Sequence, residues 1–369
     1  MKFKCDLKLL NEVVSHVSLP ISNKSTIPAL EGILLECENN NLKLTGYDLD
    51  LGITKTIEVE TMEPGAIVLN ARLFSDILRK MPDEQITITS DQKLLTRIEG
   101  IDTEFNILGM SRDEYPDMPA VDDSQGFTAP DYLLKNMINQ TLFAISVNDQ
   151  TPVLTGSLFD LNGGKMSVVS VDGYRVALRK ENIASDTDVS FVVPGKTLAE
   201  ITKLLSDQEE VMTRVSVGSR HIIFEINGYT VISRLLEGEY LDYKSAIPEG
   251  HTTRIVADTR TVVQSIERTS IIINDRNKSP VKLVTEGSTI NLTCESTIGK
   301  VSDRFEATVE GEPIRIAFNN KYMIDALKHT ECDQIYIDIN GPLSPIKIIP
   351  TEGDDFLFLV LPVRLKNEN

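Results

Sequence analysis

The stretch that looks most like a chemical site is PGKTLAE, Pro194–Glu200. Gly-Lys-Thr between a strand and a helix resembles a phosphate-binding loop, in which backbone N–H groups and the lysine hold the phosphates. Such a loop needs another glycine five residues before Gly195, and that position is Ser190, inside the predicted strand VSFVV. The stretch is therefore interpreted as the start of a helix, and Lys196 is free for another task.

Other catalytic or metal-binding arrangements have little support. None of the four cysteines is part of a C-x-x-C pair, and the four scattered histidines define no Cys/His constellation. This spacing favours small core residues over a metal or redox site for Cys5, Cys37, Cys294 and Cys332. Paired acids such as Asp48/Asp50 and Asp354/Asp355 are typical of the solvent-exposed face of a sheet. We therefore expect no catalytic residues, no metal and no cofactor.

A third candidate is SVDGYRVALRK, Ser170–Lys180. Asp172-Gly173 is a turn signal, and an aromatic and a cationic residue, Tyr174 and Arg175, follow it at once. Gly173 permits a positive φ and a close approach of the backbone to a ligand. The pattern fits the lip of a binding site, and it also fits a plain hairpin corner.

Composition limits the class of protein. The chain has 369 residues, enough for two or three domains, with 41% hydrophobic and 25% charged residues. No apolar run reaches the roughly 18 residues of a membrane helix, and the start MKFKCDLKLL lacks signal-peptide features. We expect a cytoplasmic protein without a membrane partner. The net charge of −18 alone argues against nucleic acid, although the placement of the charges matters more than their sum.

The elements that would position these residues form three repeats. The stretches 27–53, 151–178 and 279–305 each open near a proline and then give a strand, a turn, a strand, a turn and a strand. An amphipathic helix precedes each copy, and a strand, a second helix and alternating strands follow it. The sequence thus predicts an α+β fold of three tandem domains at 1–120, 127–247 and 250–369. Each would hold two helices and about eight antiparallel strands.

The six predicted helices carry a set of cations: Lys8, Arg72, Arg79, Lys80, Lys135, Lys196, Lys203, Arg260, Arg268, Lys321 and Lys328. Spacing alone favours ordinary solvent-exposed helix faces. If all six helices faced one side, however, their cations would form a basic lining while the acids lay on the sheets. Such a lining would bind phosphates despite the acidic total.

In this repeat setting, four motifs resemble the bacterial DNA polymerase III beta subunit family, the sliding clamps. They are VDGYRVAL (171–178), SRDEYPDMP (111–119) echoed by LEGEYLDYKSAIP (236–248), FNNKYMIDAL (318–327) and LVLPVRL (359–365). The resemblance covers the whole chain. It implies the DNA clamp fold and a head-to-tail homodimeric ring around duplex DNA, with helices lining the hole and sheets forming the outer wall.

The resemblance also implies function and partners. Members of this family have no catalytic activity and need no cofactor; a clamp loader opens the ring with ATP. The ring then tethers the DNA polymerase III alpha subunit and other proteins that carry a Gln-x-x-Leu-Phe-like motif, which confers processivity. A scaffold that gathers partners without DNA, and an enzyme with an unrecognised site, are the alternatives.

Site residues are carried over from the family position by position. The partner-peptide pocket comprises Leu154, Val171, Gly173, Tyr174, Arg175, Val176, Leu241, Asn319, Tyr322, Leu343, Val360, Leu361, Pro362, Val363 and Arg364, with Leu154, Val176, Val360 and Leu361 as its floor. The DNA contacts are Lys24, Arg72, Asn148, Lys196 and Lys203, and the dimer interface is Phe105, Ile107, Ile271 and Ile272. Tyr174 replaces a histidine of some relatives, Leu241 a proline and Ser245 an arginine, which leaves client preference open.

Overall fold

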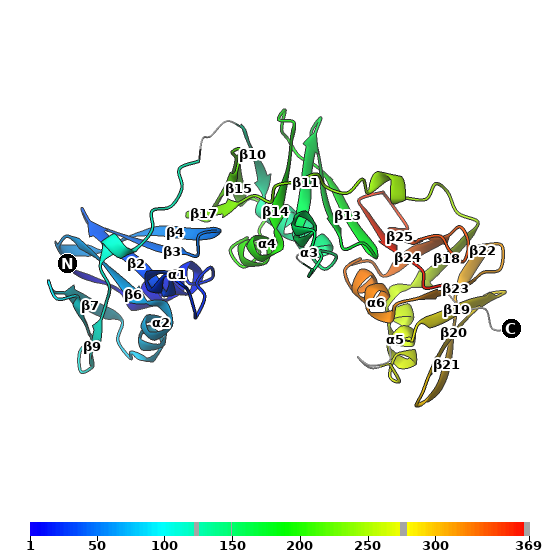
Figure 1. Ribbon diagram of the computed structural model, residues 1–369, viewed down its shortest axis with the longest axis horizontal. Helices are drawn as coiled ribbons and strands as arrows, with labels where there is room; N and C mark the ends of the chain where they lie inside the picture. Colours follow the sequence, from blue (N-terminus) through cyan, green and yellow to red (C-terminus); the bar gives the residue numbers. More distant parts are fainter. Residues whose placement is uncertain (122–124, 149, 274–278, 365–369) are drawn as a thin grey trace. The chain divides into compact units, whose positions relative to one another are not determined.

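The structure, a computed structural model, describes residues 1–121, 125–148, 150–273 and 279–364. Within these residues it contains six α-helices and 26 β-strands (Figure 1). The chain forms two compact units, Met1–Leu134 with Lys196–Leu235 and Lys135–Gly195 with Leu236–Asn369. Each compact unit therefore combines segments from two neighbouring sequence repeats. The boundaries at 1–120, 127–247 and 250–369 stay a prediction.

The first unit contains two antiparallel sheets. The five-stranded sheet has the order β5-β1-β7-β8-β9, and the eight-stranded sheet has the order β10-β15-β16-β17-β4-β3-β2-β6. Their strands are β1 (Lys2–Asp6), β2 (Gly32–Glu38), β3 (Asn41–Tyr47), β4 (Leu51–Glu58), β5 (Glu60–Glu63), β6 (Gly65–Asn70), β7 (Gln85–Ser90), β8 (Leu95–Glu99), β9 (Glu104–Leu108), β10 (Gln125–Pro130), β15 (Met212–Val217), β16 (His221–Ile226) and β17 (Tyr229–Arg234). The pairing of β4 with β17 joins the first repeat to the second.

The second unit repeats this plan. Its nine-stranded sheet has the order β14-β11-β12-β13-β26-β25-β24-β18-β22, and its four-stranded sheet has the order β21-β20-β19-β23. Their strands are β11 (Gly156–Asn162), β12 (Lys165–Val171), β13 (Arg175–Asn182), β14 (Val189–Pro194), β18 (Thr253–Asp258), β19 (Val281–Glu286), β20 (Thr289–Ser296), β21 (Gly299–Glu306), β22 (Thr308–Gly311), β23 (Arg315–Phe318), β24 (Gln334–Ile339), β25 (Ile346–Pro350) and β26 (Phe356–Val360). Here β13 of the second repeat pairs with β26 of the third.

The helices follow from local sequence. They are α1 (Leu7–Val17), α2 (Ala71–Lys80), α3 (Asp131–Leu142), α4 (Gly195–Ile201), α5 (Thr259–Thr269) and α6 (Asn320–Lys328). Four of them begin with an Asp or Asn whose side chain accepts a hydrogen bond from an N–H group of the first turn. These capping residues are Asp6, Asn70, Asp258 and Asn319. Such caps satisfy backbone donors that no earlier turn can reach. The predicted buried face of α1 is confirmed, because Leu7, Leu10, Val14 and Val17 are all buried.

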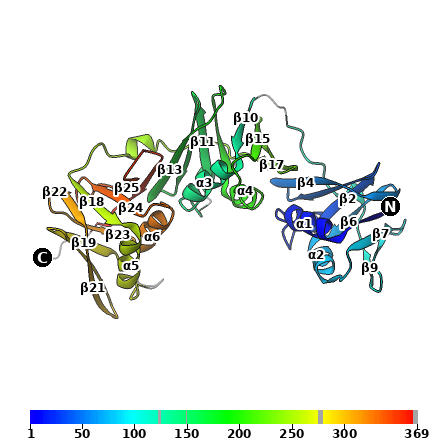
Figure 2. The same cartoon turned by 180° about the vertical axis from the view of Figure 1, so that it is seen from behind.

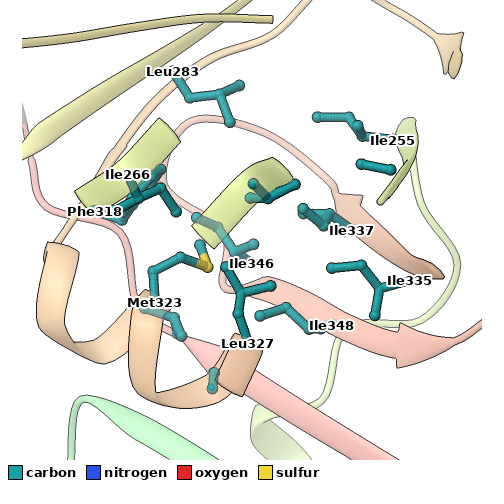
Figure 3. Close-up of a cluster of buried hydrophobic side chains, with 14 of the residues drawn as sticks. Ile255, Ile266, Leu283, Phe318, Met323, Leu327, Ile335, Ile337, Ile346 and Ile348 are labelled. Carbon is teal, nitrogen blue, oxygen red and sulfur yellow. The ribbon is translucent and has the colours of Figure 1, made fainter. Parts of the chain in front are cut away.

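The core of the second unit lies between its helices and sheets. Helices α5 and α6 lie side by side and bury one face each (Figures 1 and 2). Ile266 from α5 and Met323 and Leu327 from α6 meet Ile335, Ile337, Ile346 and Ile348 from β24 and β25 in one apolar cluster (Figure 3). None of the helices in the described residues is both long and apolar enough to cross a membrane.

A polar contact joins the first and second repeats inside the first unit. His16 Nδ1, at the end of α1, lies 2.8 Å from the hydroxyl of Tyr229 on β17. Lys55 on β4 donates to the carbonyl of Asn227 at 2.7 Å and lies over the Tyr229 ring. Burial lowers the pKa of His16 below its usual value of 6.5, the nearby Lys55 lowers it further, and Glu12 partly opposes this.

We therefore expect stability to fall with acidification through this contact. The unfolded chain protonates His16 at its ordinary pKa, about 6.5, whereas the folded chain resists protonation until a lower pH. Below about pH 6.5, the melting temperature of His16→Gln should therefore fall less on acidification than that of the parent. The difference should be on the order of 1 °C, because His16 is half-buried. Melting curves from pH 5 to 8 test this, with His221→Gln as the matched control. An unchanged pH profile in His16→Gln would contradict it.

Candidate functional site

The Asp172-Gly173 corner is a tight turn held by its own aspartate. Asp172 Oδ1 accepts the N–H groups of Tyr174 and Arg175 at 2.9 and 3.0 Å. Gly173 has φ 86°, in the left-handed region, and the space where a Cβ would stand is open. Glycine is needed here for its backbone conformation and not for close packing. The turn leaves Tyr174 exposed and begins β13 at Arg175.

Three strand ends meet at this corner. Arg175, the first residue of β13, pairs with Val360, the last residue of β26, and Val360 pairs with Ile346, the first residue of β25. The segment after β26 continues past the corner: Leu361 N–H donates to the Tyr174 carbonyl at 2.9 Å, and Val363 N–H donates to the Ala317 carbonyl at 2.7 Å. Pro362 forms a bridge with Phe318 at the end of β23. The C-terminal segment is therefore fixed on both sides.

Large apolar side chains remain exposed around this end of the sheet. We call them the apolar rim, and their exposed fractions run from 37% to 65%: Tyr174, Leu241, Leu343, Leu361 and Val363. They come from the corner, from the segment that follows β17, from the turn before β25 and from the segment after β26. Exposed apolar side chains gathered in one region are typical of a binding surface. All five were predicted as pocket residues.

Beneath the rim lies a small apolar cluster. Val171 and Val176 are buried there, with Leu154 half-buried against them, and Val360 is buried in the neighbouring core. Tyr240 and Tyr243 pack on the same cluster, and they flank Leu241. Val176 and Val360, which the sequence predicted as floor residues, are both buried in the single chain, and their contact with a client stays a prediction. They support the rim from below, and Leu361 remains as the exposed part of the predicted floor.

Helix α6 and its N-cap supply two further predicted pocket residues, Tyr322 and Asn319. Asn319 caps this helix by accepting the N–H groups of Lys321 and Tyr322 at 2.9 and 3.3 Å. The ring of Tyr322 stacks on that of Tyr174, with centroids 6.0 Å apart and planes 22° apart. Burial, and next the carboxylate of Asp172, raise the pKa of Tyr322, so it stays a neutral phenol. Arg364 is exposed beyond the rim.

The residues predicted to contact DNA are all exposed, but they do not all keep a free charge. Lys196 contacts the carboxylate of Asp48, and Lys203 lies 2.6 Å from a carboxylate oxygen of Glu200. Lys196 therefore joins α4 to the turn between β3 and β4 in the single chain, and its contact with DNA stays a prediction. Lys24 and Arg72 are exposed in the same unit. Asn148 belongs to the other unit.

The stretch PGKTLAE begins a helix, as predicted, because α4 starts at Gly195. The Thr197 hydroxyl is buried 2.6 Å from that of Ser233, where no phosphate could reach it. Three of the four cysteines are buried, whereas Cys332 is only half-buried. Burial raises the pKa of Cys5 to about 12, so its thiol is not a nucleophile. Among the described residues, no group of three acidic, His or Cys side chains is placed to hold a metal.

The predicted dimer residues lie next to two sheet edges. Strand β9, with Phe105 and Ile107, is one of the two edges of the five-stranded sheet, and β21 is one of the two edges of the four-stranded sheet. Ile271, just after α5, is 78% exposed, and Leu108 at the end of β9 is 74% exposed. Ile272 packs partly on the core of its own unit. An edge strand offers unpaired backbone groups to a further strand.

Sequence reasoning missed several residues here. Leu108 was overlooked, although it ends EFNIL, 104–108, in which polar and apolar residues alternate as in a strand. Strand β21 was not recognised as an edge. Asp325 and Phe143 also escaped notice. Asp325 Oδ2 lies 2.6 Å from Nη1 of Arg175 across 150 positions of sequence, a pairing that no local pattern signals.

Comparison with known families gives a consistent result along the chain. Family models described as DNA polymerase III beta subunit, N-terminal, central and C-terminal domain, match residues 1–119, 128–242 and 244–364. The beta sliding clamp of Bacillus subtilis is 35% identical over 377 residues, which cover 99% of this chain and 100% of the relative. That of Halalkalibacterium halodurans is 34% identical, with the same coverage.

Solved structures agree with this. The crystal structure of the DNA polymerase sliding clamp from Bacillus subtilis matches with a TM-score of 0.96 at 34% identity, covering 99% of this chain and 100% of that one. The DNA polymerase III beta subunit from Thermotoga maritima matches with a TM-score of 0.92 at 27% identity and the same coverage. The likeness thus extends over all three repeats.

Proposed function

The chain belongs to the DNA polymerase III beta subunit family, the beta sliding clamps, and on that premise we propose that two copies join head to tail into a ring around duplex DNA. The observation that carries the function is the match of three clamp-domain models in order over nearly the full length. The ring is supported by the edge strands β9 and β21, which belong to the first and the third repeat. Pairing them between copies would extend both sheets and cover Leu108 and Ile271.

The apolar rim supports a docking role for client proteins. We infer that it receives a short Gln-x-x-Leu-Phe-like segment, with the client Leu and Phe placed against Leu361, Leu343 and Val363. A peptide anchor of this kind needs apolar contacts bordered by a few polar groups. The DNA polymerase III alpha subunit, the clamp loader and other DNA-processing proteins would share this surface. The chain then acts in the cytoplasm as a non-catalytic tether that confers processivity.

The DNA contacts of such a ring would be to phosphates alone. Phosphate contacts position a protein without reading sequence, and a clamp that read bases would stall. The acidic total does not oppose this, because Lys24, in the loop after α1, and Arg72, on α2, are both exposed. Several helix cations are instead paired with acids of the same chain. Arg268 is paired with Asp303, and Lys328 is paired with Glu267.

We expect Lys24 and Arg72, which form no ion pair within the part of the chain that the structure describes, to contribute most to DNA affinity. Lys24→Ala with Arg72→Ala should weaken binding to a short open duplex and reduce the slope of log K against log salt by up to about 2, near 0.9 for each lost phosphate contact. Lys203→Ala should change the slope less, because Glu200 already neutralises that lysine. Lys43→Ala, on strand β3 and paired with Glu36, is the matched control. Fluorescence anisotropy over a salt series measures this, and sequence-selective or salt-insensitive binding would contradict it.

Retention on DNA of different topology tests the function as a whole. A loaded ring should stay on circular duplex and leave a linear duplex by sliding off its ends. A scaffold without a DNA role would show no difference between the two. Added processivity of the replicative polymerase on the circular template completes the test. Turnover of any substrate in a hydrolase and transferase screen would instead favour the enzyme alternative.

A further inference from the structure

The corner that carries Tyr174 is held from the third repeat by a single helix face. Tyr322, Asp325 and His329 follow one another at spacings of three and four, which places them on one side of α6 and its end. Tyr322 stacks on Tyr174, Asp325 pairs with Arg175, and His329 stacks on Phe143 with centroids 4.6 Å apart. Phe143 directly follows α3 and its ring lies 5.4 Å from the Arg175 guanidinium, so segments after α3 and on α6 both contact Arg175.

Arg175 is held by two carboxylates within the chain. Its Nε donates to Asp172 Oδ2 at 2.9 Å and its Nη1 donates to Asp325 Oδ2 at 2.6 Å. The guanidinium also lies 4.7 Å from the centroid of the Tyr322 ring, and only a tenth of the side chain is exposed. A guanidinium flanked by two carboxylates and an aromatic face has little left to offer a ligand. In the single chain, Arg175 therefore shapes the site through its contacts with Asp172, Asp325 and Tyr322.

The two carboxylates have different consequences. Asp172 is three positions from Arg175 and belongs to the same corner, so this pair does not fix the position of the corner relative to the third repeat. Asp325 belongs to α6, and its bond fixes the corner to the third repeat. Arg175 pairs with Val360, and Leu361 N–H is bound to the Tyr174 carbonyl. A shift of Arg175 therefore moves both Tyr174 and Leu361, two members of the apolar rim.

We propose that Asp325 is a positioning residue of the peptide site. By holding Arg175, it sets the distance of Tyr174 and Leu361 from Tyr322. This distance keeps the apolar rim in the shape that an apolar client segment needs. This rests on the proposed function of the rim. Asp325 itself would not touch the client, because its carboxylate faces Arg175.

The test measures affinity for the peptide Gln-Leu-Ser-Leu-Phe by calorimetry on the full-length chain. Asp325→Ala should weaken binding about tenfold, and Asp325→Asn, which keeps an acceptor oxygen, about threefold. Asp325→Glu should recover most of the affinity. In a double-mutant cycle, Arg175→Met should weaken binding, and adding Asp325→Ala should change it less than twofold further, because the two act through one bond.

The matched control is Glu267→Ala, which removes an acid that ties α5 to α6 through Lys328 at 2.7 Å without facing the corner. It should leave peptide affinity unchanged. The proposal would be overturned if Asp325→Ala lowered the melting temperature but kept a dissociation constant within twofold of the parent. Asp325 would then have a merely structural role. If the parent chain itself does not bind the peptide, the proposed function of the rim fails instead.

Discussion

A chain in which aspartate replaces Leu361 is expected to lose peptide binding by at least about 100-fold, equivalent to about 2.7 kcal/mol, while it keeps its fold. A client Leu and Phe buried against the rim contribute roughly 3–6 kcal/mol gross, about 1.5–3 each. Ordering an extended peptide offsets part of this, so the parent affinity should be micromolar. A carboxylate at Leu361 would have to lose its water against apolar side chains, which costs several kcal/mol.

Leu361 suits this test because its side chain is exposed, and its backbone bond to Tyr174 does not depend on the side chain. Val176→Asp would be a poorer choice, since Val176 is buried and a charge there would disrupt the sheet. Met212→Asp alters an exposed apolar residue of the other unit and is the matched control. Calorimetry with Gln-Leu-Ser-Leu-Phe measures the effect. Undiminished affinity in a folded Leu361→Asp chain would place the client site elsewhere.

The second large effect concerns assembly: Ile271→Asp combined with Leu108→Asp should yield folded monomers. Both side chains are more than 70% exposed in the single chain, so neither is needed for its fold. Truncating an apolar anchor at an interface centre costs on the order of 2–4 kcal/mol, and an unpaired buried charge costs more. Light scattering at low micromolar concentration should then give 41.0 kDa instead of twice that mass.

Leu343→Asp is the control for assembly, because Leu343 is exposed to a similar degree in the third repeat but belongs to the rim. It should stay dimeric and lose peptide binding. The variant with Ile271→Asp and Leu108→Asp should instead become monomeric and still bind the peptide. Replacing Ile272 is less informative, since this residue packs on the core of its own unit, which residue spacing alone does not reveal. A dimer that survives both aspartates would rule out these edges as the contact.

Local sequence was sufficient to predict the elements and the family. Spacings of three and four identified the buried face of α1, and alternation with Gly and Asn turns identified hairpins such as β11–β12. Order of motifs within three repeats identified the clamp family, which the comparisons confirm. These features are readable because the period of a helix or strand fixes which side chains share a face, whatever lies opposite.

The partners of those faces were decided only by tertiary structure. Periodicity did not reveal that β4 pairs with β17 and β13 with β26, or that sheets consequently run from one repeat into the next. Nor did it reveal that Lys196 meets Asp48, that Arg175 meets Asp325, or that Val360 is covered while Leu361 beside it is exposed. Each of these depends on the register between strands and helices far apart in sequence. One residue of shift would turn every side chain to the opposite face, and no single segment encodes that register.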